Sequence, residues 1–140
     1  IARELKLPIA IHSRDAAQDT IQIMRASRAE EIGGVIHCYS YSKESARDFL
    51  NMGFYFGIGG VVTFKNAKKL KEAVAYIPLS NIVLETDAPY LTPEPFRGKR
   101  NDSSKLTYVA QAIADIKQIP VDEVYAETWK NAHQMYKIQK

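Results

Sequence analysis

The chain has 140 residues, of which 46% are hydrophobic and 25% charged, a composition typical of a globular protein with one core. Its net charge of +3 permits a polyanionic partner without requiring one. A single cysteine, Cys38, excludes an internal disulfide and a thiolate zinc cluster, and favours a reducing, cytoplasmic location. No apolar run approaches the roughly 20 residues of a membrane-spanning helix, so no membrane association is expected.

In chain order, short apolar runs alternate with amphipathic segments. Residues 1–6 read as the last turns of a helix, and with a first residue other than methionine they predict that natural sequence precedes Ile1. Strands are predicted at Pro8–His12, Gly34–Cys38, Phe54–Ile58 and Ile82–Thr86. Helices are predicted at Ala16–Arg28, Glu44–Met52, Ala67–Tyr76, Leu106–Lys117 and Asp122–Lys137.

Local signals support the boundaries of two of these helices. Ser42 is suited to cap the helix that begins near Glu44, and Gly53 is suited to end it. Pro120 stands just ahead of the last helix, where proline favours a helix start.

Apolar strands that alternate with helices predict a parallel sheet covered by helices. Such a sheet is either doubly wound or part of a (β/α) barrel, and in both folds functional residues gather at the carboxyl ends of the strands. A complete barrel needs eight βα units in about 250 residues, and we count four. We therefore predict an α/β fold: the C-terminal half of a TIM-type (β/α)8 barrel, with four parallel strands, covering helices and a terminal helix. Residues 1–140 would then form half of a single barrel domain whose N-terminal half is absent.

Polar side chains stand at the ends of three predicted strands. His12 and His37 close two of the apolar runs, and Asp87 follows the fourth. Imidazole and carboxylate are ligands for divalent metals, although a single histidine in such a place is more often a structural group. The pattern alone leaves both interpretations open. Glu85, two residues before Asp87, faces the same side of a regular strand, where it would either hold a ligand in place or serve as a structural acceptor inside the barrel.

The segments that carry these residues, read together, are similar to a known family. LPIAIHSRDA, GGVIHCYS, FYFGIGG and IVLETDAPYLTPEP, followed by RGKRN, resemble in this order the second half of the TatD family of metal-dependent deoxyribonucleases. That family belongs to the amidohydrolase-like barrels, and the resemblance extends over about residues 1–140. It implies two divalent ions (Mg, Mn or Zn) with His12, His37 and Asp87 among their ligands. The His-x-His pair and the further glutamate of the family site have no counterpart here, and by strand order they belong in the missing half.

The resemblance also implies a reaction. Two metals can clamp a phosphodiester and lower the pKa of a bound water, and Asp87 beside that water would position it and take its proton. Asp87 is therefore the predicted catalytic residue as well as a ligand; the alternatives are that it is a ligand only or that it caps the following loop.

A basic loop follows Asp87. Arg97, Lys99 and Arg100 lie within four residues, and guanidinium groups match phosphate oxygens in pairs. We therefore predict that this loop holds the substrate backbone or steadies the mouth of the barrel. The alternative is an exposed basic turn, or ion pairs with Glu94 or Asp102. The chain departs from the family directly afterwards, with Asp-Ser-Ser at 102–104 where the family more often has a proline shortly after RN.

The predicted function is a TatD-type hydrolase of phosphodiester bonds in DNA, seen as a fragment that lacks part of its metal site. Two alternatives stay open: an amidohydrolase that acts on a substrate other than nucleic acid, and a catalytically silent half-barrel that binds a partner. The expected partners are DNA and either the missing N-terminal half or a second copy, because an incomplete barrel leaves unpaired strand edges. The isolated fragment is expected to be inactive and to bind metal weakly.

Overall fold

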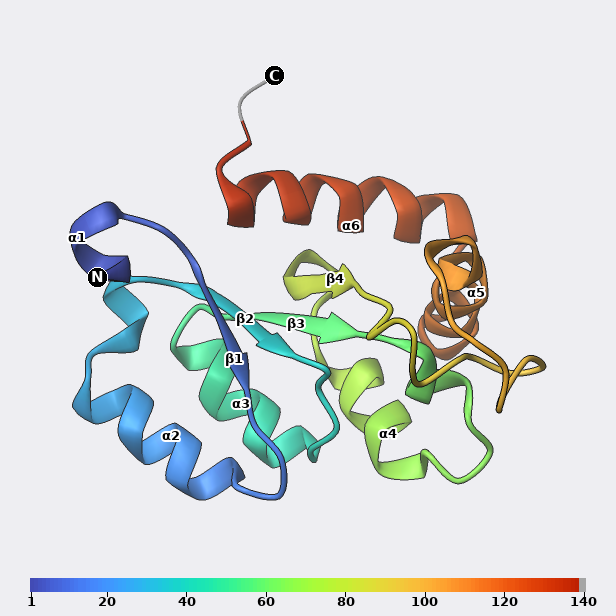
Figure 1. Cartoon of the computed structure of the whole chain (residues 1–140), viewed down its shortest axis with the longest axis horizontal. Helices are drawn as coiled ribbons and strands as arrows, with labels where there is room; N and C mark the ends of the chain where they lie inside the picture. Colours follow the sequence, from blue (N-terminus) through green and yellow to red (C-terminus); the bar gives the residue numbers. More distant parts are fainter. Residues whose placement is uncertain (139–140) are drawn as a thin grey trace.

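The computed structural model describes residues 1–138 and is built around four parallel strands (Figure 1). The sheet has the order β1-β2-β3-β4, with β1 at Ile9–His12, β2 at Gly34–His37, β3 at Tyr55–Ile58 and β4 at Ile82–Leu84. Strand order therefore follows chain order, as in a (β/α) barrel, whereas a doubly wound sheet reverses direction at a switch point. The fourth strand is shorter than predicted, although the Glu85 N–H still donates to the carbonyl of Ile58 at 3.1 Å.

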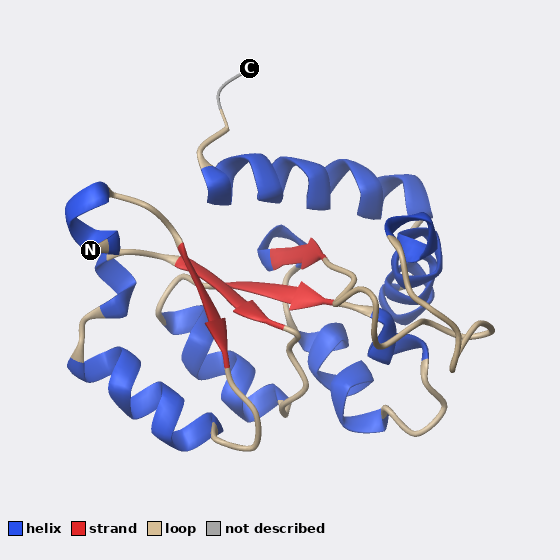
Figure 2. Ribbon diagram, viewed as in Figure 1, coloured by secondary structure: helices blue, strands red, loops and turns tan. Residues whose placement is uncertain are grey.

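Helices lie on both sides of this sheet. Figure 2 shows the strands between two layers, with α2 (Ala17–Ala26), α3 (Lys43–Asn51) and α4 (Lys68–Tyr76) on one side and α6 (Val121–Tyr136) on the other. The short α1 (Ala2–Leu5) precedes β1, and α5 (Leu106–Lys117) packs against both α4 and α6. Four single-turn 3₁₀ helices were not predicted: η1 at Ala29–Glu31, η2 at Gly60–Thr63, η3 at Leu79–Asn81 and η4 at Ser103–Lys105.

The predicted boundary signals act as expected around α3. The Ser42 hydroxyl accepts a hydrogen bond from the backbone N–H of Ser45 at 3.5 Å, which satisfies one of the free donors at the helix start. After the helix, Gly53 has a φ of +74°, and its N–H donates to the carbonyl of Leu50 at 2.8 Å. Glycine suits this left-handed position because it has no Cβ.

Alternate strand residues divide the core into two unequal parts. On the side of α2, α3 and α4, a large cluster of fully buried side chains includes Ile36, Phe56, Ile58 and Ile82 from the strands. On the side of α6, a small separate cluster consists of Val35, Val83 and Met135, flanked by Tyr55 and Ala132. The large cluster holds the strands in place, since each buried side chain of this size contributes about 1.5–3 kcal/mol.

One negative finding concerns membranes: across residues 1–138, no helix has the length and apolar character required to cross a bilayer.

Candidate active site

The two predicted histidines lie side by side at the carboxyl ends of adjacent strands. His12 is the last residue of β1, His37 is the last residue of β2, and the two are paired in register. Their ring centroids are 5.8 Å apart, at an angle of 37°. The parallel register thus brings together two residues that are 25 positions apart in the sequence.

The two predicted carboxylates reach the same histidine from the segment directly after β4. His37 Nδ1 lies 2.9 Å from Glu85 Oε2, and Nε2 lies 3.1 Å from Asp87 Oδ1. The second oxygen of Glu85 accepts from the backbone N–H of Cys38 at 2.5 Å. His12, His37, Glu85 and Asp87 therefore form one group, which we call the strand-end cluster.

A glycine in the intervening strand makes this cluster possible. β3 lies between β2 and β4, so the side chain of Glu85 has to cross it to reach His37. It does so over Gly57, where a Cβ would stand 1.9 Å from Glu85 Oε2. Sequence reasoning did not assign this role. The only signal in the sequence was the glycine itself, because a glycine within an apolar strand often marks a place where another group approaches the backbone closely.

Charge and burial act against each other in the strand-end cluster. Burial tends to lower the pKa of His37, but the carboxylates of Glu85 and Asp87 outweigh that effect and raise the pKa above its ordinary value. Burial also raises the pKa of Glu85, although His37 opposes the rise. The neighbouring thiol of Cys38 has its pKa raised to about 11, mainly by burial and further by Glu85, so it stays protonated near neutral pH.

The atoms around His37 are of the types that bind a metal cation. A neutral imidazole has only one N–H, so it cannot donate to Glu85 and Asp87 at once. If Nδ1 donates to Glu85, the lone pair of Nε2 faces Asp87, and this is how a carboxylate commonly orients a metal-binding histidine. Within residues 1–138, however, no three or more His, Cys, Asp or Glu side chains are arranged to hold a metal ion on their own. The ligand types are suitable, and further donors are needed to complete a site.

The predicted basic loop forms a pocket instead of ion pairs. Arg97, Lys99 and Arg100 line a cavity of about 570 Å³ together with Phe64 and Tyr90. Across the described residues, none of the three basic side chains pairs with Glu94 or Asp102, and Asp102 instead binds Lys105 at 2.5 Å. The ion-paired alternative therefore has no support in the structure. All three basic side chains are exposed, as the alternative of an exposed basic turn predicts, and phosphate binding stays a prediction.

Asn101, the last residue of RGKRN, was missed by the sequence reasoning. It is 3% exposed, and its side-chain amide donates to the carbonyls of Thr86 at 2.7 Å and Tyr90 at 2.8 Å. Its backbone N–H donates to the carbonyl of Pro89 at 3.0 Å. Asn101 thus fixes the turn that contains Asp87, whose φ of 54° lies in the left-handed region. A buried polar residue just after three surface charges gives no local signal of such a role.

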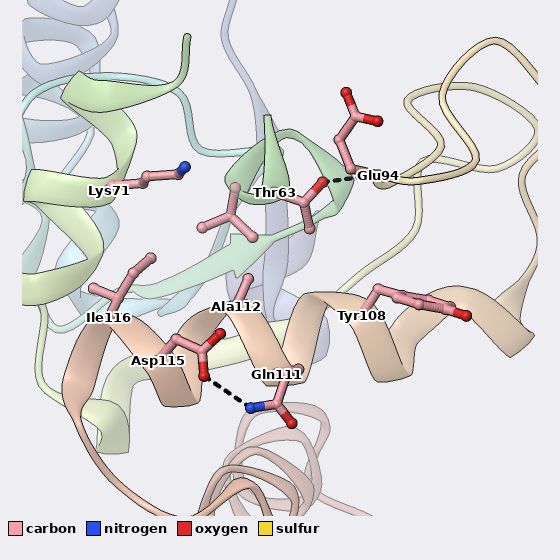
Figure 3. Close-up of a pocket in the computed structure, with 9 residues that line it drawn as sticks. Thr63, Lys71, Glu94, Tyr108, Gln111, Ala112, Asp115 and Ile116 are labelled. Carbon is pink, nitrogen blue, oxygen red and sulfur yellow. Dashed lines mark hydrogen bonds between the residues drawn. The ribbon is translucent and has the colours of Figure 1, made fainter. Parts of the chain in front are cut away.

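A separate cavity of about 420 Å³ lies among the helices (Figure 3). Its walls come from η2, α4 and α5, with Lys71 on one side and Asp115 on another. The Gln111 amide donates to the carboxylate of Asp115 at 2.8 Å. None of the predicted site residues lines this cavity, so it is distinct from the strand-end cluster.

Comparison with known proteins gives a consistent result. The family model described as TatD related DNase matches residues 1–137. An uncharacterized metal-dependent hydrolase of Bacillus subtilis, YabD, is 48% identical over 138 residues, which are 99% of this chain and 54% of YabD. Escherichia coli YcfH, described in the same words, is 41% identical and is matched over 99% of this chain and 52% of its own length.

Solved structures show the same arrangement. The crystal structure of YJJV, a TatD homologue from Escherichia coli, superimposes with a TM-score of 0.91 at 27% identity, covering 99% of this chain and 53% of that one. An uncharacterized amidohydrolase from Saccharomyces cerevisiae matches with a TM-score of 0.79 at 16% identity, covering 92% of this chain and 53% of its own, and supports the fold alone.

The chain thus spans about half the length of the curated relatives and solved structures that it matches. Four parallel strands in chain order, matched to half of such longer chains, confirm the predicted half-barrel. With the family model matched over residues 1–137, the chain belongs to the TatD family.

Proposed function

We propose that the complete protein is a metal-dependent hydrolase that cleaves phosphodiester bonds of DNA, and that this chain supplies part of its metal site. The observation that carries the proposal is the strand-end cluster, in which His37 lies between Glu85 and Asp87 and beside the ring of His12. The names of the relatives, metal-dependent hydrolases, and the description of the family as related to a DNase support the same chemistry.

In this proposal each residue of the cluster has a distinct task. His12, His37 and Asp87 would hold two divalent ions, which supply the charge that activates water and stabilises the phosphoryl oxygens. Glu85 holds the ring of His37 through Nδ1. Asp87 is partly open to solvent and would accept a proton from the attacking water.

We also propose that a further half-barrel completes the site. The sheet ends at β1 and β4, and the relatives are about twice as long as this chain. A second copy could pair with these edges, but it would only duplicate the same ligands, so the remaining βα units of a longer polypeptide suit the site better. The 140-residue chain alone should accordingly bind metal weakly and hydrolyse nothing.

An amide or lactone hydrolase would use the same ligands, because one fold serves many substrates. The basic pocket after Asp87 favours a phosphate-bearing substrate, since Arg97, Lys99 and Arg100 have no carboxylate partner across the described residues. Replacing both arginines with glutamine should weaken DNA binding and flatten its salt dependence. An unchanged salt slope would remove the support that this loop gives to a DNA substrate.

The central test is Asp87→Asn in the complete protein. Turnover of a DNA oligonucleotide should fall by about 100-fold or more, because ligation and proton acceptance are both lost. Asp115→Asn, in the separate cavity between α4 and α5, is the matched control and should retain normal turnover. Near-normal hydrolysis by Asp87→Asn at saturating metal would refute the assignment, and cleavage of an amide or lactone in place of DNA would refute the substrate.

A further inference from the structure

The pocket formed by the loop after Asp87 contains more than basic side chains. Its volume of about 570 Å³ falls in the range of small-molecule sites. Besides Arg97, Lys99 and Arg100, its lining includes the aromatic rings of Phe64 and Tyr90. Metal binding and proton transfer at Asp87 require neither ring.

The ring of Tyr90 faces solvent, while the backbone N–H and C=O of the same residue are both hydrogen-bonded. The residue is 72% exposed, more than any other described tyrosine or tryptophan. Its N–H donates to the carbonyl of Asp87 at 2.9 Å, and its carbonyl accepts from the side chain of Asn101 at 2.8 Å. A ring with few rotatable bonds on a fixed turn offers a flat apolar surface that loses little entropy on binding.

The basic side chains of the pocket have different surroundings. The Arg97 guanidinium lies over the ring of Phe64, 4.2 Å from its centroid, so a cation–π contact already holds it. The Thr92 hydroxyl donates to the carbonyl of Lys99 and closes the loop between them. Arg100 and Lys99 form no ion pair with any described residue, although the Lys99 ammonium lies 5.9 Å from the ring centroid of Phe96. Both side chains are exposed and remain available to an anion.

We propose that this pocket binds one nucleotide of the substrate, with the base stacked on Tyr90 and a phosphate facing Arg100 and Lys99. A flat aromatic surface next to unpaired cations is the combination that recognises a nucleotide whose base is free to stack. The backbone N–H of Tyr90 donates to the carbonyl of Asp87, so the pocket belongs to the loop that begins at the predicted catalytic residue. The inference rests on the proposed function in one respect, that the substrate is DNA.

The test measures binding without hydrolysis. A fluorescently labelled deoxythymidine hexamer is titrated with the complete protein in EDTA, which removes the divalent ions needed for hydrolysis, and affinity is read from anisotropy. Tyr90→Ala should bind about tenfold more weakly, since a base stacked on an aromatic ring contributes about 1–3 kcal/mol. Tyr90→Phe keeps the ring and should bind like the unmodified protein. Tyr76→Ala removes an exposed tyrosine on α4, away from the pocket, and should have no effect.

A second oligomer tests the same contact without any mutation. A hexamer of abasic sites keeps the phosphates and removes the bases, so the unmodified protein should bind it as weakly as Tyr90→Ala binds the thymidine hexamer. Arg100→Ala should weaken both oligomers and lower the dependence of affinity on salt by about one counterion. Equal affinity of the unmodified protein for the two hexamers, unchanged binding by Tyr90→Ala, or no binding by the unmodified protein would each overturn the inference.

Failure of this inference can be told apart from failure of the proposed function. If the complete protein cleaves DNA and Tyr90→Ala leaves its KM and kcat unchanged, the stacking role is wrong and the hydrolase assignment stands. If the complete protein fails to cleave DNA while oligomer binding in EDTA still depends on Tyr90, the pocket stands and the assigned reaction is wrong.

Discussion

The two faces of the sheet differ in what they bury. The face toward α2, α3 and α4, which we call the packed face, carries Phe56 and Ile58, both fully buried. The opposite face, which we call the open face, carries His12 and His37 at its carboxyl end and is covered by α6 only around Val35, Val83 and Met135. Residues on the two faces alternate along the same strands, so each strand contributes to both.

This contrast shows how one short strand provides stability and chemistry together. Packing on one face fixes the backbone, and the next residue along then projects its side chain in a set direction on the other face. In β3, Phe56 is an anchor in the packed core and Gly57 gives Glu85 its path to His37. The strand-end cluster is thus positioned partly by residues such as Phe56 that face away from it, and each face can be tested separately.

The largest effect on stability is expected from truncation on the packed face. Phe56 is fully buried and packs edge-on against Tyr39, with ring centroids 5.0 Å apart. Phe56→Ala should lower the free energy of unfolding by about 3–5 kcal/mol, measured by urea denaturation. Tyr55→Ala, its neighbour on the open face, is the matched control and should cost clearly less, because Tyr55 is only partly buried. Equal costs for the two variants would contradict the distinction between the faces.

A smaller loss is expected where α6 is attached to the sheet. Asn131 is fully buried, and its amide donates to the carbonyls of Leu79 and Ile82, each at 2.8 Å. Asn131→Ala would leave both carbonyls without this donor and should cost about 2 kcal/mol in the same denaturation experiment. Gln134→Ala, on an exposed position of the same helix, should be close to neutral. A neutral Asn131→Ala would show that α6 is held by its apolar contacts alone.

These elements also show how far the sequence determines the fold. The strands and helices were predicted because apolar runs, Ser42 and Gly53 are local signals, and the structure has each of them within a few residues. The early end of β4 was not predicted, because Glu85 and Thr86, which follow it, are held by the distant residues His37 and Asn101 and not by the apolar pattern.

The residue types of the candidate site could be predicted from the sequence, but most of the contacts between its side chains could not. His12, His37, Glu85 and Asp87 could be selected because parallel strands end at one edge of the sheet. That Glu85 crosses β3 could not, since this depends on sheet order and on the absence of a side chain at Gly57. The two side-chain bonds of Asn101 likewise join segments that meet only in the folded chain.

A third prediction concerns the crossing point itself. In Gly57→Ala the new Cβ would collide with the end of the flexible Glu85 side chain, which should swing away from His37 and from the N–H of Cys38. We expect a stability loss of only about 1 kcal/mol, together with roughly tenfold weaker metal binding by the complete protein, because His37 loses its orienting carboxylate. Calorimetric metal titration and urea denaturation measure the two effects.

Gly59→Ala is the control for this substitution. Its Cβ would meet the backbone oxygen of Glu85 at 3.3 Å and would leave the carboxylate where it is. Metal affinity should therefore change much less than in Gly57→Ala. If Gly57→Ala binds metal normally, the Glu85–His37 contact does not orient a ligand.

The smallest effect is expected from a charge among the helices on the packed side. The Lys117 ammonium donates to the carbonyl of Ile77 at 2.6 Å, and burial lowers its pKa below the ordinary 10.5. Between the folded pKa and 10.5 the unfolded chain binds more protons than the folded chain, so the contribution of Lys117 to the free energy of unfolding rises with pH in that window. The slope of the free energy of unfolding against pH from one group cannot exceed about 1.4 kcal/mol per pH unit.

Lys117→Met should flatten the pH profile of the free energy of unfolding as pH approaches 10.5 from below, whereas Lys68→Met, exposed on α4, should leave that profile unchanged. Identical slopes for Lys117→Met and the unmodified chain would mean that the Lys117 ammonium is as well solvated in the fold as in the unfolded chain.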